Sequence, residues 1–229
     1  MRWVITGANR GLGLEFVRQL AARGDVVEAG ARNPDDAAKL GALAAASGGR
    51  VRVHACDVAD DASVVAFAKS IGQVPVDVLV NNAGVMGKMK GLEDLDLADV
   101  TRTYNVNALG PIRVTRALLP QLMLAKTRRI AHVTSGMGSI GDNGSGGAYG
   151  YRMSKAALNM MNKSLSVDYA GRGFTCIVLN PGWVQTDMGG KGAPTPVEES
   201  VGKMIARIDG LTPAENGTFV DYKGGTYVW

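Results

Sequence analysis

The chain has 229 residues, of which 46% are hydrophobic and 20% charged, a composition typical of a soluble globular domain. Its 25 basic and 21 acidic residues give a net charge of +4 spread along the sequence, which does not match the concentrated basic face of a nucleic-acid-binding protein. No apolar stretch is long enough to span a membrane, and the first strand-like run starts at Arg2 without a leader segment. We therefore expect a cytoplasmic protein that binds neither nucleic acid nor membrane.

Short β-branched runs alternate along the chain with longer segments of helical periodicity. Strands are predicted over residues 2–6, 26–31, 51–55, 77–81, 130–134, 174–180 and 217–221. Helices are predicted over residues 11–23, 35–46, 61–71, 97–125 with an early break, 149–171 and 196–209. This alternation predicts an α/β fold, a doubly wound Rossmann-type domain with a seven-stranded parallel sheet that covers residues 1–229.

The two cysteines and the two histidines lie within these strand-like runs or at their ends. Cys56 and Cys176 are interpreted as reduced packing residues, and nothing in their spacing indicates a disulfide framework or a metal site. His54 and His132 are interpreted as hydrogen-bonded core residues rather than catalytic bases.

A glycine-rich turn joins the first predicted strand to the first predicted helix. Its sequence is Thr6-Gly7-Ala8-Asn9-Arg10-Gly11-Leu12-Gly13. Glycines permit a tight turn and allow a pyrophosphate to approach the helix N-terminus, whose free N–H groups favour an anion. The turn therefore predicts a nucleotide-binding site.

Three further motifs follow in order: Asn81-Asn82-Ala83-Gly84, Tyr151-x-x-x-Lys155 and Pro181-Gly182. Together with the glycine turn, their order and spacing resemble the short-chain dehydrogenase/reductase family, from residue 4 to at least residue 187. The stretch from Ser135 to Asn143, followed by Tyr151-Arg-Met-Ser-Lys155, resembles the small carbonyl-reductase branch that includes C-factor-like proteins.

The end of the second strand indicates which nicotinamide cofactor the site would take. An NAD site needs an acidic residue there for the ribose 2′-hydroxyl, but this strand ends in Ala31 and Arg32 follows it. Arg10 of the glycine turn approaches the same point, and two guanidinium groups suit a 2′-phosphate. Glu28 lies too early in the strand to reach the ribose. We therefore predict NADP(H) as the cofactor.

The resemblance implies the rest of the cofactor site. The residues assigned to it, beyond Arg10 and Arg32, are Gly7, Asn9, Gly11, Leu12, Gly13, Asp57, Val58, Asn81, Ala83, Gly84, Tyr151, Lys155, Pro181, Gly182, Val184 and Thr186. Asp57 and Val58 are expected beside the adenine. Val184 and Thr186 are expected beside the nicotinamide carboxamide.

Tyr151 and Lys155 are the predicted acid–base pair, since a spacing of four residues places both on one face of a helix. A neighbouring ammonium is expected to lower the pKa of the phenol toward neutral pH. Tyr149 falls on another face.

Ser135 is expected to polarise a substrate carbonyl, because it ends the fifth strand, where ligands bind in such sheets. Ser139 and Ser145 are alternatives. Asn107 matches the family asparagine whose implied role is to hold a water that relays protons to Lys155, and Asn105 is the alternative.

The implied reaction is reversible NADPH-dependent reduction of a ketone or aldehyde to an alcohol, with the proton given by Tyr151. Met86, Met137, Trp183 and Met188 predict an apolar substrate pocket, with core packing as the alternative for each. The Gly- and Pro-rich loop 188–196 is either a connector or a flap over this pocket. The resemblance also implies a homodimer through the helices that begin near 97 and 149. A non-catalytic NADP(H)-binding sensor on the same fold is the alternative function, whereas a methyltransferase would leave the Tyr151–Lys155 spacing unexplained.

Overall fold

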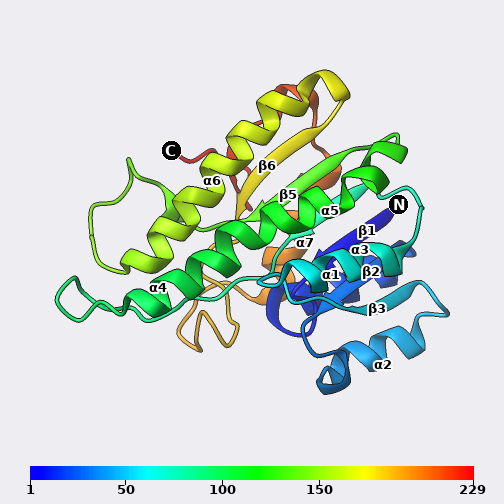
Figure 1. Ribbon diagram of the computed structural model, residues 1–229, viewed down its shortest axis with the longest axis horizontal. Coiled ribbons are helices and arrows are strands. Elements are labelled where there is room, and N and C mark those ends of the chain that lie inside the picture. Colours follow the sequence, from blue (N-terminus) through cyan, green and yellow to red (C-terminus); the bar gives the residue numbers. More distant parts are fainter.

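The computed structural model describes residues 1–229 and contains one seven-stranded parallel sheet (Figure 1). The strands lie in the order β3-β2-β1-β4-β5-β6-β7. Their bounds are β1 Arg2–Thr6, β2 Val26–Ala31, β3 Val51–Ala55, β4 Val78–Asn81, β5 Arg129–Val133, β6 Thr175–Asn180 and β7 Phe219–Asp221. The order reverses between β1 and β4, which creates a crevice at the carboxyl ends of these two strands.

Helices cover both faces of the sheet. They are α1 Gly11–Arg23, α2 Ala38–Ala46, α3 Asp61–Ile71, α4 Leu97–Tyr104, α5 Gly110–Leu124, α6 Tyr149–Tyr169 and α7 Val197–Asp209. Residues of α1, α2 and α7 pack in one core cluster against one face, and residues of α3 and α5 pack in a second cluster against the other. In Figure 1, α3, α5 and α6 lie in front of the sheet. The expected doubly wound architecture is confirmed.

Alternate side chains of the central strands explain the two clusters. Ile5 and Val80 face the first cluster, whereas Val4 and Leu79 face the second, and all four are fully buried. A strand buried on both faces has no polar side, which is why these runs are continuously apolar in the sequence.

The predicted helix over 97–125 is divided by a π-helical turn, Asn105–Leu109, between α4 and α5. Pro111 lies at the start of α5, where its missing N–H cannot complete a regular hydrogen-bond ladder with the preceding turn. The early break expected from the sequence is therefore a widening of the helix rather than an end. Such π turns are frequent at functional sites.

Both cysteines are buried and unpaired, as predicted for packing residues. Burial raises the pKa of the Cys56 thiol and of the Cys176 thiol to about 12, so neither is a thiolate near neutral pH.

A buried carboxylate joins β1, β2 and β3. Glu28 is fully buried, lies 2.8 Å from His54 Nε2 and 3.2 Å from Arg52 Nη1, and also pairs with Arg2. His54 Nδ1 in turn lies 2.8 Å from the Ser70 hydroxyl of α3. Burial by itself would raise the pKa of Glu28, but the hydrogen bond with His54 and the charges of Arg2 and Arg52 outweigh it, so the pKa lies below 4.5.

We expect Glu28→Gln to reduce the free energy of unfolding by about 1–3 kcal/mol at neutral pH, because Arg2 and Arg52 lose their buried counter-charge. A lowered folded-state pKa contributes stability that is present above the unfolded value near 4.5 and is lost as the pH falls through the folded value. The difference between wild type and variant in urea unfolding should therefore shrink in acid. The exposed Glu93→Gln is the control, and an equal loss in both variants at neutral pH would contradict the prediction.

Candidate active site

A cleft of about 430 Å³ opens at the carboxyl ends of the strands, at the reversal point between β1 and β4. The predicted cofactor residues that line it are Gly7, Asn9, Arg10, Gly11, Leu12, Arg32, Asp57, Val58, Ala83, Gly84, Tyr151, Lys155, Pro181 and Thr186. The structure thus brings together residues that are far apart in the sequence.

The cleft also includes residues that the sequence analysis did not assign to the cofactor, among them Asn33, Asn82, Val85, Arg102, Thr134 and Asp187. Most of these directly adjoin a predicted motif residue, so extending each motif along its strand end or loop would have found them. Arg102 has no such signal, because it lies in α4 and reaches the cleft only through the tertiary fold.

The glycine turn owes its shape to two close approaches. Gly7 has a φ of 64°, and a Cβ there would lie 2.8 Å from Ala83 Cα, so both conformation and space require glycine. A Cβ at Gly13 would overlap the carbonyl oxygen of Gly7. Gly13 was assigned to cofactor binding, but it does not line the cleft. Its place is at the contact between α1 and the turn.

The two adjacent asparagines point in different directions. Asn82 lines the cleft, and its Nδ2 donates to Thr6 O at 2.9 Å and to Gly7 O at 3.2 Å. Asn81, the residue assigned to the cofactor, is instead buried behind the cleft, where its Nδ2 lies 3.1 Å from Thr115 Oγ1 and 3.1 Å from His132 Nδ1. Side chains alternate along a strand, so only one of two neighbours can face the ligand side. Only one ring nitrogen of His132 is hydrogen-bonded, since its Nε2 has no partner.

The residue that follows β2 is the basic Arg32, and Asp36 of the short turn beyond it also lines the cleft. Arg10 and Arg32 both line the cleft. Glu28 does not line it, as its early position in the strand predicted, and is buried in an ion-pair cluster. Arg10 Nη1 lies 3.2 Å from Asp187 Oδ2, with both side chains mostly exposed. An exposed pair of this kind is weak, so Arg10 remains available to a stronger anion.

The segment after β6 contributes fewer cleft residues than predicted. Pro181 and Thr186 line the cleft, whereas Gly182 packs against the ring of Tyr222 and Val184 is buried. The loop beyond it is tied down at its base, where Gln185 N donates to Thr195 O at 2.9 Å and Gly190 N donates to Thr186 O at 2.8 Å. Whether its tip moves as a flap stays a prediction.

Tyr151 and Lys155 lie one turn apart on the buried side of α6. Their exposed fractions are 8% and 5%, whereas Tyr149 is exposed. Lys155 Nζ donates to the Val133 carbonyl at 2.8 Å and lies 5.8 Å from the centre of the Tyr151 ring. The expected juxtaposition on one helix face is therefore present.

The electrostatics differ from the expectation that Lys155 lowers the pKa of Tyr151. Burial raises the pKa of Tyr151 above 10, and the neighbouring Ser135 hydroxyl offsets this only in part. Burial lowers the pKa of Lys155 to about 8. The cause is that both groups are withdrawn from water and that the ammonium bonds a carbonyl rather than the phenol. Tyr151 is thus held protonated, as a proton donor requires.

Ser135 lies two residues beyond the end of β5, and its hydroxyl lies beside Tyr151. Its alternatives are engaged elsewhere. The hydroxyl of Ser139 donates to Val228 O at 2.6 Å, and the exposed Ser145 accepts from Arg152 Nη2 at 2.8 Å. The positions of these three hydroxyls favour Ser135.

Asn107 lies fully buried in the π-helical turn. Its Oδ1 accepts from Val85 N at 2.8 Å, and its Nδ2 donates to Val85 O at 2.8 Å and to Ser154 Oγ at 3.0 Å. The side chain is therefore occupied in holding the loop after β4 against α6. Asn105, the alternative, donates to Ala59 O at 3.2 Å.

Of the four residues expected to form an apolar substrate pocket, only Met188 borders the cleft. Trp183 is 60% exposed, with its indole N–H donating to Gly189 O at 2.8 Å. Met86 and Met137 are half-buried in the loops after β4 and β5.

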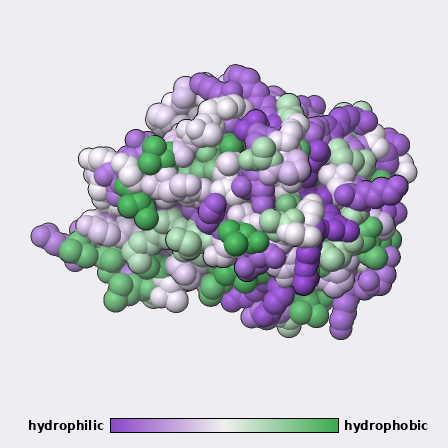
Figure 2. Space-filling model, turned by 90° about the horizontal axis from the view of Figure 1, so that it is seen from above, coloured by the Kyte–Doolittle hydropathy of each residue, from purple (hydrophilic) through white to green (hydrophobic).

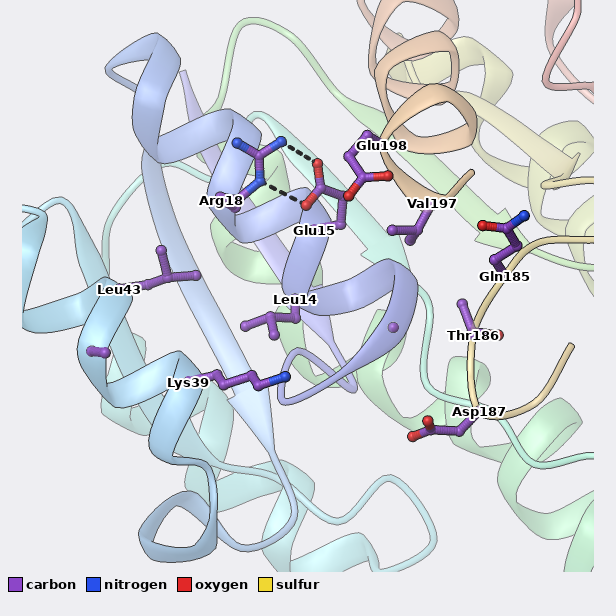
Figure 3. A pocket seen from close by; sticks show the side chains of 12 residues that line it. Leu14, Glu15, Arg18, Lys39, Leu43, Gln185, Thr186, Asp187, Val197 and Glu198 are labelled. Carbon is purple, nitrogen blue, oxygen red and sulfur yellow. Dashed lines mark hydrogen bonds and ion pairs between the residues drawn. The ribbon is translucent and has the colours of Figure 1, made fainter. Parts of the chain in front are cut away.

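A second hollow, of about 640 Å³, lies behind the glycine turn between α1, α2 and the segment 185–198 (Figure 3). Its two charged side chains from α1, Glu15 and Arg18, bond to each other at 2.5 and 2.7 Å. It contains no tyrosine, serine or histidine that could exchange a proton. The 430 Å³ cleft is therefore the candidate active site.

Several known proteins are similar to this chain in sequence. C-signal of Myxococcus xanthus is 55% identical over 164 residues, which cover 72% of this chain and 99% of that protein. A 1-hydroxy-2-glutathionyl-2-methyl-3-butene dehydrogenase of a Rhodococcus species is 35% identical over 98% of this chain and 97% of its own.

Solved structures agree with these relatives. NADPH-bound carbonyl reductase from chicken fatty liver superposes with a TM-score of 0.94 at 34% identity, covering 100% of this chain and 98% of its own. The carbonyl reductase Sniffer of D. melanogaster has the same TM-score at 33% identity, with coverages of 100% and 99%. The family model described as short chain dehydrogenase matches residues 2–196. The chain belongs to the short-chain dehydrogenase family, in its carbonyl-reductase-like and C-factor-like branch.

Proposed function

We propose that this oxidoreductase reduces the carbonyl of a small, largely apolar ketone or aldehyde to an alcohol, with NADPH as the cofactor. The observation that carries the proposal is the buried Tyr151 phenol, with the Ser135 hydroxyl and Lys155 beside it, in the same cleft as the glycine turn. Free cysteines are in keeping with a cytoplasmic setting. No helix combines the length and hydrophobicity that crossing a membrane would require.

The residues present fit a phosphorylated dinucleotide. The turn at Gly7 leaves no room for a side chain, so backbone can approach a pyrophosphate at the start of α1. Arg10 and Arg32 line the adenosine end, and no carboxylate ends β2. The similar carbonyl reductase that was solved with NADPH supports this choice of cofactor.

Bound NADPH would supply the hydride. The Ser135 hydroxyl would donate a hydrogen bond to the carbonyl oxygen and polarise it, and Tyr151 would give its phenolic proton to the same oxygen. Lys155, anchored on Val133 O, would hold a positive charge beside the developing phenolate. Asn107 would hold the water through which Lys155 exchanges protons. The reverse oxidation would use the same groups.

Replacing Tyr151 by phenylalanine should lower kcat for NADPH-dependent reduction of a small carbonyl panel by roughly 10²–10⁴-fold, because the proton donor is lost. NADPH affinity, measured by nicotinamide fluorescence, should change little. Tyr149→Phe is the matched control, since this exposed tyrosine is two residues away on the same helix. Equal slow rates in both variants and wild type, with NADPH bound tightly, would instead favour a non-catalytic NADP(H) sensor, a function that the resemblance to C-signal keeps open.

Replacing Arg32 by alanine should weaken NADPH binding by roughly 10–100-fold, the value of one charge-assisted contact to the 2′-phosphate. NADH binding, which lacks that phosphate, should be unaffected. Isothermal titration of both cofactors measures the difference, with the exposed Arg50→Ala as the control for a general charge effect. An unchanged NADPH affinity in Arg32→Ala would remove the 2′-phosphate assignment.

We also propose that two copies pair through α4, α5 and α6. The outward faces of these helices carry exposed apolar side chains: Leu97, Ile112, Met153, Met160 and Val167. Figure 2 shows hydrophobic atoms interrupting the hydrophilic surface toward the end of the molecule where Figure 1 places α4 and the start of α6. Patches of this kind mark protein interfaces.

Met160→Glu, on the exposed face of α6, should convert the dimer to a monomer in analytical ultracentrifugation, since it places a charge where an apolar contact forms. Val65→Glu on α3 is the control, because Val65 is also exposed but lies on a different helix. A wild type that sediments as a monomer would refute this assembly.

A further inference from the structure

The segment Thr226–Trp229 lies against the loop 136–141, which follows β5. After β7 the chain turns back at Lys223 and Gly224, and Tyr227 N donates to Phe219 O at 2.8 Å, so the segment runs antiparallel along the outer edge of the sheet. The Tyr227 ring stacks on Phe219, with centroids 4.7 Å apart and 23° between the planes. Trp229 lies on the same phenylalanine at 5.6 Å. The segment is thus anchored on β7 before it reaches the active-site side.

From this anchor the segment bonds the 136–141 loop at two places. Gly141 N donates to Trp229 O at 2.8 Å, and the Ser139 hydroxyl donates to Val228 O at 2.6 Å. Ser139 is 1% exposed and also accepts from Asp142 N at 3.1 Å. These bonds close off the far end of the loop.

The near end of the loop is held through Asn180, the last residue of β6. Its Nδ2 donates to Asp221 Oδ2 at 3.0 Å and to the Tyr227 hydroxyl at 2.8 Å, while its Oδ1 accepts from Gly136 N at 3.1 Å. Because a carboxylate can only accept, the Asp221 contact determines which way the amide faces and leaves Oδ1 for Gly136. Burial and the negative charge of Asp221 raise the pKa of Tyr227, so its hydroxyl keeps its proton.

The 226–229 segment and the 136–141 loop pack so closely that little room remains for a side chain at the contacting glycines. A Cβ at Gly136 would lie 3.3 Å from the Tyr227 hydroxyl and ring, and a Cβ at Gly141 would lie 2.9 Å from Val228 Cγ1. On the opposite side, Asn159 of α6 donates to Gly138 O at 3.1 Å, and a Cβ at Gly138 would lie 2.9 Å from Lys155 Cβ. The loop is therefore clamped between α6, which carries the acid–base pair, and the 226–229 segment.

Ser135 immediately precedes this clamped loop and depends on it for its orientation. Its Oγ accepts from Met137 N at 3.2 Å, and its carbonyl accepts from Gly138 N at 2.9 Å. A shift of Gly136 or Gly138 would therefore turn the serine hydroxyl relative to Tyr151. Small displacements of a group that stabilises charge in a transition state cost large factors in rate.

We propose that Tyr227, acting through Asn180 and with the rest of the 226–229 segment, is a positioning residue that sets the orientation of Ser135 for carbonyl reduction. The inference rests on the proposed reductase function. It assigns a role to a segment that does not line the cleft and that no motif marks.

The test compares Tyr227→Ala and Tyr227→Phe with Tyr169→Ala as the matched control. Tyr169 also packs on a phenylalanine, Phe174, with centroids 5.3 Å apart, but at the amino end of β6, away from the cleft. We expect Tyr227→Ala to lower kcat at least about tenfold with KM and NADPH affinity within about twofold, since only the orientation of Ser135 changes. Tyr227→Phe, which keeps the ring but not the bond to Asn180, should fall between it and wild type. Tyr169→Ala should keep the wild-type kcat.

Amide hydrogen exchange gives a readout that needs no substrate. In Tyr227→Ala the amides of Gly136 and Gly141 should exchange faster, while the Ala8 amide, bonded to Gly30 O in the glycine turn, should not change. A wild-type kcat in Tyr227→Ala, or unchanged exchange at Gly136 and Gly141, would overturn the proposal. So would a parallel loss of NADPH affinity, melting temperature and Ala8 protection, which would mean general unfolding.

The two proposals fail in different ways. If wild type binds NADPH but reduces no carbonyl, the reductase function fails, and the exchange rates at Gly136 and Gly141 alone decide whether the segment clamps the loop. If wild type is active and Tyr227→Ala is equally active, the reductase function stands and the positioning role is refuted.

Discussion

The hydrogen bond from the buried Lys155 ammonium to the Val133 carbonyl is 2.8 Å long and connects the proposed catalytic residues of α6 to the sheet. A charged amine withdrawn from water must find a partner, and the last residue of β5 provides it. This bond holds the Lys155 side chain of α6 at the end of β5. Tyr151, one turn earlier on the same helix, and Ser135, two residues beyond the strand, then lie beside each other. The burial that makes the bond necessary also lowers the pKa of Lys155 to about 8.

Around this bond, the site is assembled from elements that approach more closely than side chains normally allow. Gly7 meets Ala83, Gly13 meets the carbonyl of Gly7, and Gly138 meets Lys155. Each glycine therefore replaces a side chain with a backbone contact, which leaves the carboxyl ends of β1, β4 and β5 close enough to share one cleft. The positions of the residues in the site are fixed by the strand ends and by the close packing of the loops that follow them.

Polar groups behind the cleft have a positioning role of a different kind. Asn107 holds Val85 against α6, Asn159 holds Gly138, and Asn180 holds Gly136. Each is a buried amide that bonds at least one backbone group of a loop, and each also bonds a side chain.

The amino-acid sequence by itself determined the order of the strands and helices, because alternating β-branched runs and helical periods require an α/β sheet. It also determined the pairing of Tyr151 with Lys155, since a spacing of four is a geometric property of any helix. Local sequence likewise identified the glycine turn and the basic end of β2.

Only the tertiary structure decided how those parts act on one another. Asn82 rather than Asn81 faces the cleft, and Gly13 packs against the Gly7 carbonyl. Both placements depend on how neighbouring segments pack in the folded protein. The rise in the pKa of Tyr151 depends on burial by elements distant in sequence. The contact of Tyr227 with Gly136 joins residues 91 positions apart (227 − 136) through β6 and β7. Local pattern carries no information on such contacts, since they arise only when the sheet brings its strand ends together.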